Sequence, residues 1–326
     1  MRIITRKGLI RIAIVMVALP VIAKFAMCDC GRGRIAMGIV PSISATNLSR
    51  HVHYIAGELG EHNVTIPWAL KKAATYIEAE WRAQGHTVTR WPYKVQEIEC
   101  DNLEITFTGT TKPKEIVIIG AHYDSVEGAP GANDNGSGVA ALLELSRHFA
   151  NANRTVRFVA FVNEEPPYYE TELMGSRVYA QACRQRGDDV RAMISLETMG
   201  YFSDEPGSQK FPSVLFKLVY PTKGNFIGFV GNFSSRKIIR QAAAGFRGAS
   251  DFPLECCATY GGLAGIGWSD HASFWKEGYP AFQISDTAPF RYPYYHTAED
   301  TPDKLNYPAL ARVTQGVYGA IRALAE

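Results

Sequence analysis

Residues Glu115–Phe149, which indicate the fold class most directly, read EIVIIGAHYDSVEGAPGANDNGSGVAALLELSRHF. The first six of these residues form a short apolar run, which is typical of a strand covered on both faces of a sheet. A glycine-rich loop follows, and residues 137–149 are expected to form a helix that is entered through Gly136. This order of strand, loop and helix predicts one unit of an α/β sheet.

The same alternation continues on both sides of this stretch. Apolar or alternating runs predict further strands at 87–95, 102–108, 155–162, 192–196, 213–219, 225–230 and 280–285. Helix-like spacing of apolar residues predicts helices at 47–60, 66–84, 175–186, 269–277 and from 308 to the C-terminus. Strands that alternate with helices favour a largely parallel central sheet with helices on both faces.

The composition bounds the class of protein. The chain has 326 residues, of which 46% are hydrophobic and 20% charged, so disorder and a coiled coil are excluded as its main state. Lys and Arg number 34 and Asp and Glu 32, and this net charge of +2 argues against a nucleic-acid binder, which usually has a basic face. Six cysteines are too few for a disulfide scaffold, and their spacing leaves the pairing open.

Polar side chains that could bind metal follow nearly every predicted strand. In open α/β sheets, ligands bind beyond the carboxyl ends of the strands. Imidazoles and carboxylates without a thiolate suit Zn²⁺, with Mn²⁺ and Co²⁺ as competitors on chemistry alone. The sequence therefore predicts a metal site at this edge of the sheet, with candidates at His122 and Asp124, Asp134, Glu164 and Glu165, Glu197, and His296.

Two features of this set suggest how the chemistry would be divided. Asp134 lies in the glycine-rich loop, where the backbone can approach closely, and it is the natural bridge between two ions ~3.5–4 Å apart. Glu164 and Glu165 are neighbours at a strand end, so their side chains point in different directions. One can bind metal while the other accepts a proton from metal-bound water, whose pKa is ~7 rather than ~16.

At these residues the sequence resembles the zinc aminopeptidase family M28, which includes bacterial leucyl aminopeptidases and animal glutaminyl cyclases. The resemblance runs from about Ile55 to the end and rests on AHYDS at 121–125, GANDNGSG at 131–138, NEE at 163–165, SDHASF at 269–274 with GYP at 278–280, and HTAEDT at 296–301. It implies one catalytic domain with a mixed, mostly parallel sheet, as in zinc exopeptidases.

The resemblance also implies a role for each candidate. His122 and Glu197 bind the first zinc, Glu165 and His296 bind the second, and Asp134 bridges both. Glu164 is the general base and acid, and Asp124 orients His122, as metal-bound histidines usually require. The sequence departs from the family at Glu197, where Asp is frequent. Asp270 either caps the helix that follows it or lines the pocket. His271 is expected to be structural, and the aromatic residues at 290–295 either wall the pocket or pack the core.

The function that follows is a di-zinc aminopeptidase, with two Zn²⁺ per chain and a peptide with a free N-terminus as substrate. Metal-bound hydroxide is expected to be the nucleophile, with Glu164 as general base. The alternative is an enzyme like a glutaminyl-peptide cyclotransferase with one zinc; such enzymes carry Trp where this chain has Tyr295. A receptor-like domain that has lost catalysis is disfavoured, because every ligand position carries a ligating residue. The oligomeric state is left open.

Residues 1–30 differ from the rest of the chain. Basic residues precede a twelve-residue apolar run from Ile12 to Ala23, which is the pattern of an export signal. Extending the run to residues 8–27 reaches the ~20 residues of a membrane span, so a signal peptide and a retained membrane anchor both remain open. We expect a linker at 31–46 and a single M28-like peptidase domain at 47–326. The protein would be periplasmic, secreted or membrane-anchored, with its catalytic domain outside the cytoplasm.

Overall fold

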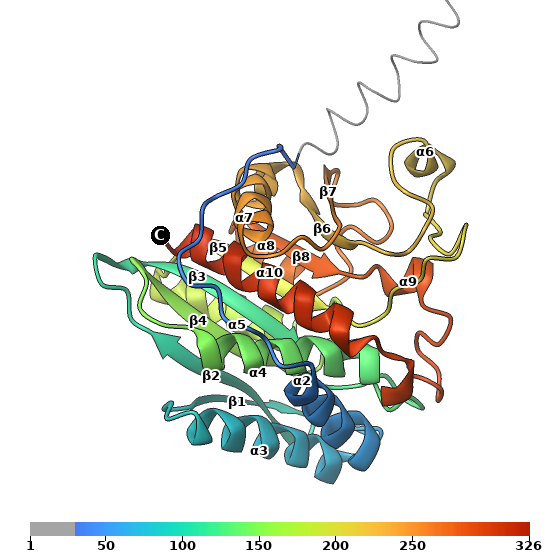
Figure 1. The fold of residues 1–326 in the computed structure, drawn as a ribbon. Coiled ribbons are helices and arrows are strands. Elements are labelled where there is room, and N and C mark those ends of the chain that lie inside the picture. Colours follow the sequence, from blue (N-terminus) through green and yellow to red (C-terminus); the bar gives the residue numbers. More distant parts are fainter. Residues whose placement is uncertain (1–29) are drawn as a thin grey trace, which may run out of the picture.

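A computed structural model describes residues 30–326, and eight strands of this part of the chain form one mixed sheet (Figure 1). The strand order is β1-β2-β4-β3-β5-β8-β6-β7. The four central strands β4, β3, β5 and β8 run parallel, whereas β1 and β2 are antiparallel at one edge and β6 runs antiparallel to β8. The expected mixed, mostly parallel sheet is confirmed. The strands are β1 (Thr89–Val95), β2 (Ile98–Phe107), β3 (Lys112–His122), β4 (Arg154–Phe161), β5 (Asp189–Glu197), β6 (Ile227–Asn232), β7 (Leu254–Thr259) and β8 (Ala281–Ser285).

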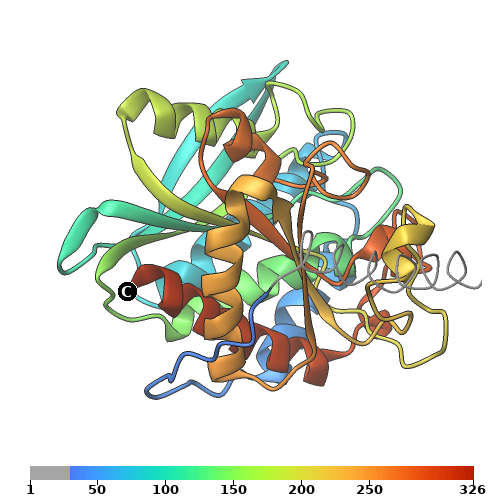
Figure 2. The same ribbon diagram turned by 90° about the horizontal axis from the view of Figure 1, so that it is seen from above.

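Helices cover both faces of the sheet (Figure 2). The larger core lies under α2 (Ala45–Val52), η1 (His53–Glu58), α3 (Pro67–Ala83), α4 (Gly138–His148), α7 (Arg236–Ala249) and α10 (Tyr307–Ala325). The smaller core, on the other face, lies under α5 (Gly175–Arg186) and α8 (His271–Lys276). Short helices join these elements: η2 (Ala132–Ser137), α6 (Val214–Lys217), η3 (Phe233–Ser235), α9 (Ala288–Arg291) and η4 (Pro302–Lys304).

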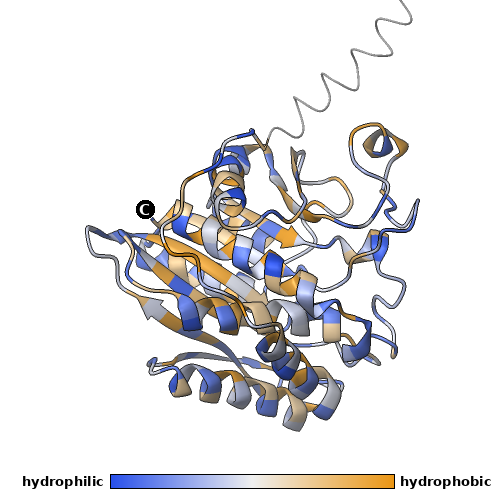
Figure 3. Ribbon diagram, in the orientation of Figure 1, coloured by the Kyte–Doolittle hydropathy of each residue, from blue (hydrophilic) through white to orange (hydrophobic). Residues whose placement is uncertain are grey.

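The central strand β3 shows why the chain folds this way. Successive side chains of a strand point to opposite faces of the sheet. Val117 and Ile119 accordingly enter the larger core, while Ile116 and Ile118 enter the smaller one, and all four are buried. Figure 3 shows the hydrophobic colour concentrated on the central strands, with hydrophilic residues on the outer sides of the helices. An uninterrupted apolar run is therefore what this position in the sheet requires.

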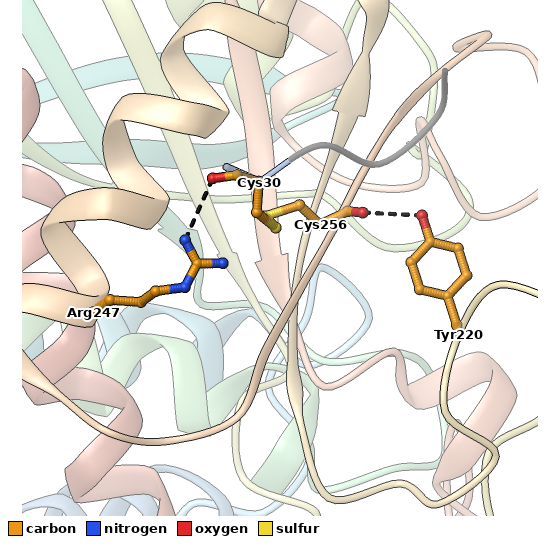
Figure 4. The surroundings of a disulfide bond; sticks show 4 residues. All are labelled: Cys30, Tyr220, Arg247 and Cys256. Atoms are coloured by element: carbon orange, nitrogen blue, oxygen red, sulfur yellow. Dashed lines mark hydrogen bonds between the residues drawn. A yellow bond between two sulfur atoms is a disulfide. The ribbon is translucent and has the colours of Figure 1, made fainter. Parts of the chain in front are cut away.

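The first described residues are fastened to the body of the protein. Residues 30–44 contain no helix or strand, and α2 begins at Ala45, within the segment 31–46 that was expected to be a linker. Cys30 forms a disulfide with Cys256 in β7 (Figure 4). The backbone N–H of Ile35 donates to the carbonyl of Ala244 in α7 at 3.0 Å. Among the cysteines that the structure describes, Cys100, Cys183 and Cys257 are unpaired and buried.

The signal peptide or anchor predicted at residues 1–30 lies, except for Cys30, outside the described part of the chain. Within residues 30–326, none of the helices combines the length and the apolarity that crossing a bilayer demands.

The structure corrects the sequence prediction between residues 213 and 259. The strand expected at 213–219 is wrong, because the segment forms the single turn α6 inside a long loop. Its apolar side chains are divided between a cavity and solvent: Phe216 is buried, whereas Val214 and Leu218 are 74% and 64% exposed. Two elements were not anticipated, the helix α7 and the short strand β7.

Candidate metal centre

The residues that the sequence singled out converge at the carboxyl edge of the parallel strands. His122 is the last residue of β3, and Glu197 is the last residue of β5. Glu164 and Glu165 lie three and four residues beyond the end of β4. Asp134 lies in η2, and His296 lies in the loop that follows α9. Five segments that are distant in sequence therefore supply one group of side chains.

Asp134 lies between the two histidines. Its Oδ1 is 3.3 Å from Nε2 of His122, and its Oδ2 is 3.1 Å from Nε2 of His296. Glu197 Oε2 is 3.4 Å from His122 Nε2, and Glu165 Oε2 is 3.4 Å from His296 Nε2. The carboxylates of Asp134, Glu164, Glu165 and Glu197 are buried, as is His122, whereas the side chain of His296 is 31% exposed. His122 therefore lies close to Asp134 and Glu197, and His296 lies close to Asp134 and Glu165.

Several buried polar atoms of this cluster have no hydrogen-bond partner. They are His122 Nε2, Asp134 Oδ1 and Glu165 Oε1. A buried polar atom without a partner costs about 1–3 kcal/mol, so native proteins rarely leave several of them together. Three sets of ligating atoms, each within 4.8 Å of one another, fall in this cluster. They are His122, Asp134 and Glu197; Asp134, Glu165 and His296; and His122, Glu164 and Glu165. The nitrogen and oxygen donors fit Zn²⁺.

The buried cluster holds four carboxylates, those of Asp134, Glu164, Glu165 and Glu197, beside two imidazoles. Burial, together with the charge of Asp134, raises the pKa of Glu165 to about 8. Burial also raises the pKa of Glu164 and that of Glu197. Burial would lower the pKa of His296, but hydrogen bonds with Asp134 and Glu165 outweigh it and raise that pKa to about 10. Carboxylates crowded into one buried pocket disfavour one another's charge, and divalent cations would reverse this effect.

Asp124 holds three site residues at once. Its Oδ1 accepts the backbone N–H of Glu164 and its Oδ2 that of Glu165, both at 3.1 Å. The Nδ1 atom of His122 lies 3.1 Å from the backbone carbonyl of Asp124 and 3.6 Å from its carboxylate. The carboxylate predicted to orient His122 therefore makes its direct hydrogen bonds to the two glutamates, and the closer partner of the imidazole is the carbonyl oxygen.

Two positioning residues escaped the sequence analysis. The carboxylate of Asp300 accepts the backbone N–H of Asn133 at 2.8 Å and that of Asp134 at 3.1 Å, and so fixes η2. The hydroxyl of Ser269 donates to Glu197 Oε2 at 2.7 Å. Both residues stand inside the motif stretches 269–274 and 296–301. Their place there was the available signal, but their hydrogen-bond partners are distant in sequence.

The remaining candidates are placed as follows. Asp270 is fully buried and makes no side-chain hydrogen bond to cap α8, and burial raises its pKa to about 7. His271 is structural as expected, because it is buried and its ring nitrogen lies 2.8 Å from the carbonyl of Ile266. Of the aromatic run at 290–295, Tyr295 lines the cavity over the cluster together with Trp268 and Tyr169.

Comparison with known proteins agrees with this geometry. Residues 102–321 match the model of peptidase family M28. The chain is 34% identical over 284 residues to the uncharacterized protein YfbL of Escherichia coli, covering 84% of this chain and 86% of that one. It is 28% identical over 265 residues to the probable aminopeptidase YDR415C of Saccharomyces cerevisiae, covering 76% of this chain but only 64% of the yeast protein.

Solved structures share the fold. The zinc aminopeptidase BSAP of Bacillus subtilis superposes with a TM-score of 0.68 at 15% identity, covering 87% of this chain and 95% of that one. The glutaminyl cyclase of Fimbriiglobus ruber superposes with a TM-score of 0.67 at 18% identity, covering 90% and 99%. The family match spans most of the chain and includes every residue of the metal cluster. The chain therefore belongs to peptidase family M28, a family of zinc-dependent exopeptidases.

Proposed function

We propose that this protein is a zinc aminopeptidase that uses two zinc ions to hydrolyse the first peptide bond of peptides with a free N-terminus. The observation that carries the proposal is the position of Asp134. Its two carboxylate oxygens face different imidazoles, those of His122 and His296, at 3.3 Å and 3.1 Å. This arrangement suits a carboxylate shared by two cations.

The donor atoms divide into two sets around Asp134. His122 and Glu197 would complete one zinc site, and Glu165 and His296 would complete the other. Bound zinc supplies Lewis acidity, which polarises a carbonyl and makes water a stronger acid at neutral pH. The hydroxyl of Ser269 donates to Glu197 Oε2, the oxygen that lies 3.4 Å from His122 Nε2, and so fixes the position of this carboxylate.

Glu164 is the proposed general base and acid. Its Oε2 is 3.8 Å from His122 Nε2, so it borders the cluster, and its backbone is held by Asp124. Burial raises the pKa of Glu164, which makes its carboxylate a better proton acceptor than an exposed one. The carboxylate can take a proton from the attacking water and deliver it to the leaving amine.

A glutaminyl cyclase with one zinc is the second candidate. The fold of the Fimbriiglobus ruber cyclase covers 90% of this chain, nearly the same share as the aminopeptidase BSAP. The aminopeptidase is favoured by the two ligand sets that share Asp134, and by Tyr295, since the cyclases that the sequence resembles carry Trp there.

Metal analysis combined with a substrate panel separates the two. We expect about two zinc ions per chain and release of amino acid from aminoacyl-anilides, lost with a chelator and restored by zinc. Ring closure on glutaminyl peptides with one zinc per chain would establish the cyclase instead. A purified protein without tightly bound zinc or activity on either substrate would revive the non-catalytic alternative.

We also propose that the folded domain lies outside the cytoplasm. Two observations support this location: the basic segment and apolar run before residue 24, and the disulfide between Cys30 and Cys256. Disulfides persist in oxidising compartments and are rare in the cytosol. Thiol labelling after cell fractionation tests the proposal, because a protein recovered from the cytosol with both of these cysteines alkylated would contradict it.

A further inference from the structure

The loop that carries α6 exposes apolar side chains to solvent, while its aromatic side chains pack against the body of the protein. Phe211, Phe216 and Tyr220 stack on one another, with ring centroids 5.9–6.2 Å apart, and line an apolar cavity. Although these three aromatic residues hold the loop in place, Val214 and Leu218 are 74% and 64% exposed. Figure 3 shows α6 as a hydrophobic turn on the outside of the molecule. Large exposed apolar side chains grouped on one element usually mark a contact surface.

The α6 loop itself carries charge of one sign. Residues 206–226 contain three Lys and neither Asp nor Glu, whereas Asp204 and Glu205 precede them and Glu255 of β7 lines the same cavity as Phe216. Lys210, Lys217 and Lys223 come from the loop itself, and all three are exposed. Apolar residues interleaved with exposed lysines are the pattern of segments that lie in the interface of anionic membranes.

The described chain begins next to this loop. Cys30 is bonded to Cys256, and the hydroxyl of Tyr220, which follows α6, donates to the carbonyl of Cys256 at 2.9 Å (Figure 4). Figure 1 shows α6 and the start of the described chain at the same end of the molecule. From Ala23, the last residue of the N-terminal apolar run, to Cys30 there are seven residue steps, which span at most about 25 Å. If that run is held in a bilayer, the α6 loop cannot lie far from the lipid surface.

We propose that the α6 loop is a membrane-contact element that docks on an anionic bilayer, with Val214 and Leu218 entering the interface and the three lysines facing lipid headgroups. The apolar exposure, the single sign of charge and the short connection to the N-terminal run all point to this one partner. The inference rests on the proposed location of the domain and on retention of the N-terminal run as an anchor, and it does not depend on the proposed reaction.

The test uses the full chain with Cys28→Ser, so that an introduced cysteine is the reactive thiol. An environment-sensitive fluorophore is placed at Leu218→Cys or, as a matched control, at Trp68→Cys. Trp68 lies on α3, far from α6 in Figure 1, and is 60% exposed. Each protein is reconstituted in vesicles of phosphatidylcholine, with or without phosphatidylglycerol, and the label is challenged with an aqueous quencher.

We expect the label at 218 to shift to the blue and to be protected from quenching only when phosphatidylglycerol is present. The label at 68 should remain aqueous throughout. Raising the salt from 0.1 to 1 M should weaken the response, since the Debye length falls from about 10 to about 3 Å. Lys217→Gln and Lys223→Gln should each lower the ratio of docked to undocked protein about fivefold.

Two results would overturn the proposal. One is a label at 218 that stays as exposed as the label at 68 while the protein remains with the vesicles. The other is protection of the label at 218 without lipid as the protein concentration rises, which would identify a second copy of the chain as the partner. Hydrolysis of an aminoacyl-anilide, measured in the same samples, reports on the proposed reaction separately.

Discussion

Among the individual residues of the site, Glu164 is the one proposed to transfer protons, and the residues around it are proposed to bind metal. Glu164 borders the cluster at 3.8 Å from His122 Nε2, and its partner in sequence, Glu165, lies 3.4 Å from His296 Nε2. Neighbouring residues with the same side chain thus meet different histidines. In the proposed mechanism, this difference in position would allow Glu164 to transfer protons while Glu165 binds metal.

Glu164→Gln separates these two roles. The amide keeps the shape of the side chain but cannot accept the proton, so we expect kcat for an aminoacyl-anilide to fall at least ~100-fold. Zinc content should remain that of the unchanged protein. The matched control is Glu299→Gln, which alters an exposed glutamate in the loop of His296 and should leave kcat unchanged. A Glu164→Gln enzyme that keeps the original rate would remove this residue from the mechanism.

Asp300 acts on the cluster through the backbone. Its carboxylate accepts the N–H groups of Asn133 and Asp134 and the hydroxyl of Tyr292, the last at 2.7 Å. Asp300→Ala leaves these three donors without their acceptor and loosens the loop that presents Asp134. Because residues that support metal ligands typically contribute 10–100-fold in affinity, we expect zinc to bind about 10–100-fold more weakly.

Competition with a chelator measures this change in zinc affinity. Asp303→Ala is the control, since Asp303 is exposed in the same segment and its side chain is hydrogen-bonded to Thr301 and Lys304. Asp300→Asn, which retains one acceptor oxygen, should fall between the two. Equal zinc affinity in all three variants would show that Asp300 does not position the ligand loop.

Among the helices and strands, the sequence predicted best those elements whose side chains all lie in one kind of environment, such as a fully buried strand. The apolar runs that became β3, β4 and β5 could be predicted because both of their faces are buried. The segment at 213–219 is as apolar, but its side chains are divided between a cavity and solvent, and no strand forms. The helix α7 was missed although its buried residues Ile239, Ala242, Ala243 and Phe246 have helical spacing, and its packing partner α10 lies about 70 residues downstream.

The metal cluster could be predicted for a related reason. Every predicted ligand follows a strand end or lies in the loop next to one, and parallel strands bring such ends to one edge. Asp300 and Ser269 could not be assigned roles in this way. Their partners, the backbone of Asp134 and the carboxylate of Glu197, are 166 and 72 residues away and become neighbours only in the folded chain.

The contact between α7 and α10 depends on two glycines. A Cβ atom added to Gly245 would lie 2.3 Å from the carbonyl oxygen of Gly319, and one added to Gly319 would lie 2.4 Å from that of Gly245. Ala is the better helix former by about 1 kcal/mol, but this clash is with backbone and can be relieved only by separating the helices. We therefore expect Gly245→Ala to lower the free energy of unfolding by about 1–2 kcal/mol.

Urea denaturation of Gly245→Ala and of Gly57→Ala tests this expectation. Gly57 is also helical, but an added Cβ would meet nothing closer than Pro302 at 3.5 Å, which is ordinary contact. Gly57→Ala should therefore leave the free energy of unfolding unchanged or raise it by up to about 1 kcal/mol. Equal stability of both variants would mean that the two helices adjust freely at their crossing.

At the scale of the whole molecule, one covalent bond joins the first described residues to the far edge of the sheet. Cys30 and Cys256 are 226 residues apart, and β7, which carries Cys256, is the last strand in the sheet order. A bond that closes so long a loop restricts the unfolded chain strongly. It also holds the start of the described chain beside the α6 loop, because Tyr220 contacts the carbonyl of Cys256.

Removing this bond should destabilise the protein without disturbing the metal cluster, to which neither cysteine belongs. We expect Cys30→Ser to lower the free energy of unfolding by about 2–5 kcal/mol, the usual effect of losing a disulfide. Reduction of the unchanged protein should lower its melting temperature to that of Cys30→Ser, while the same reductant should leave the variant unaffected. This comparison isolates the bond, since any effect of the reductant on the unpaired thiols would appear in both proteins. If reduction leaves the melting temperature of the unchanged protein where it was, the bond contributes nothing to stability and its role is confined to holding the N-terminal segment against β7.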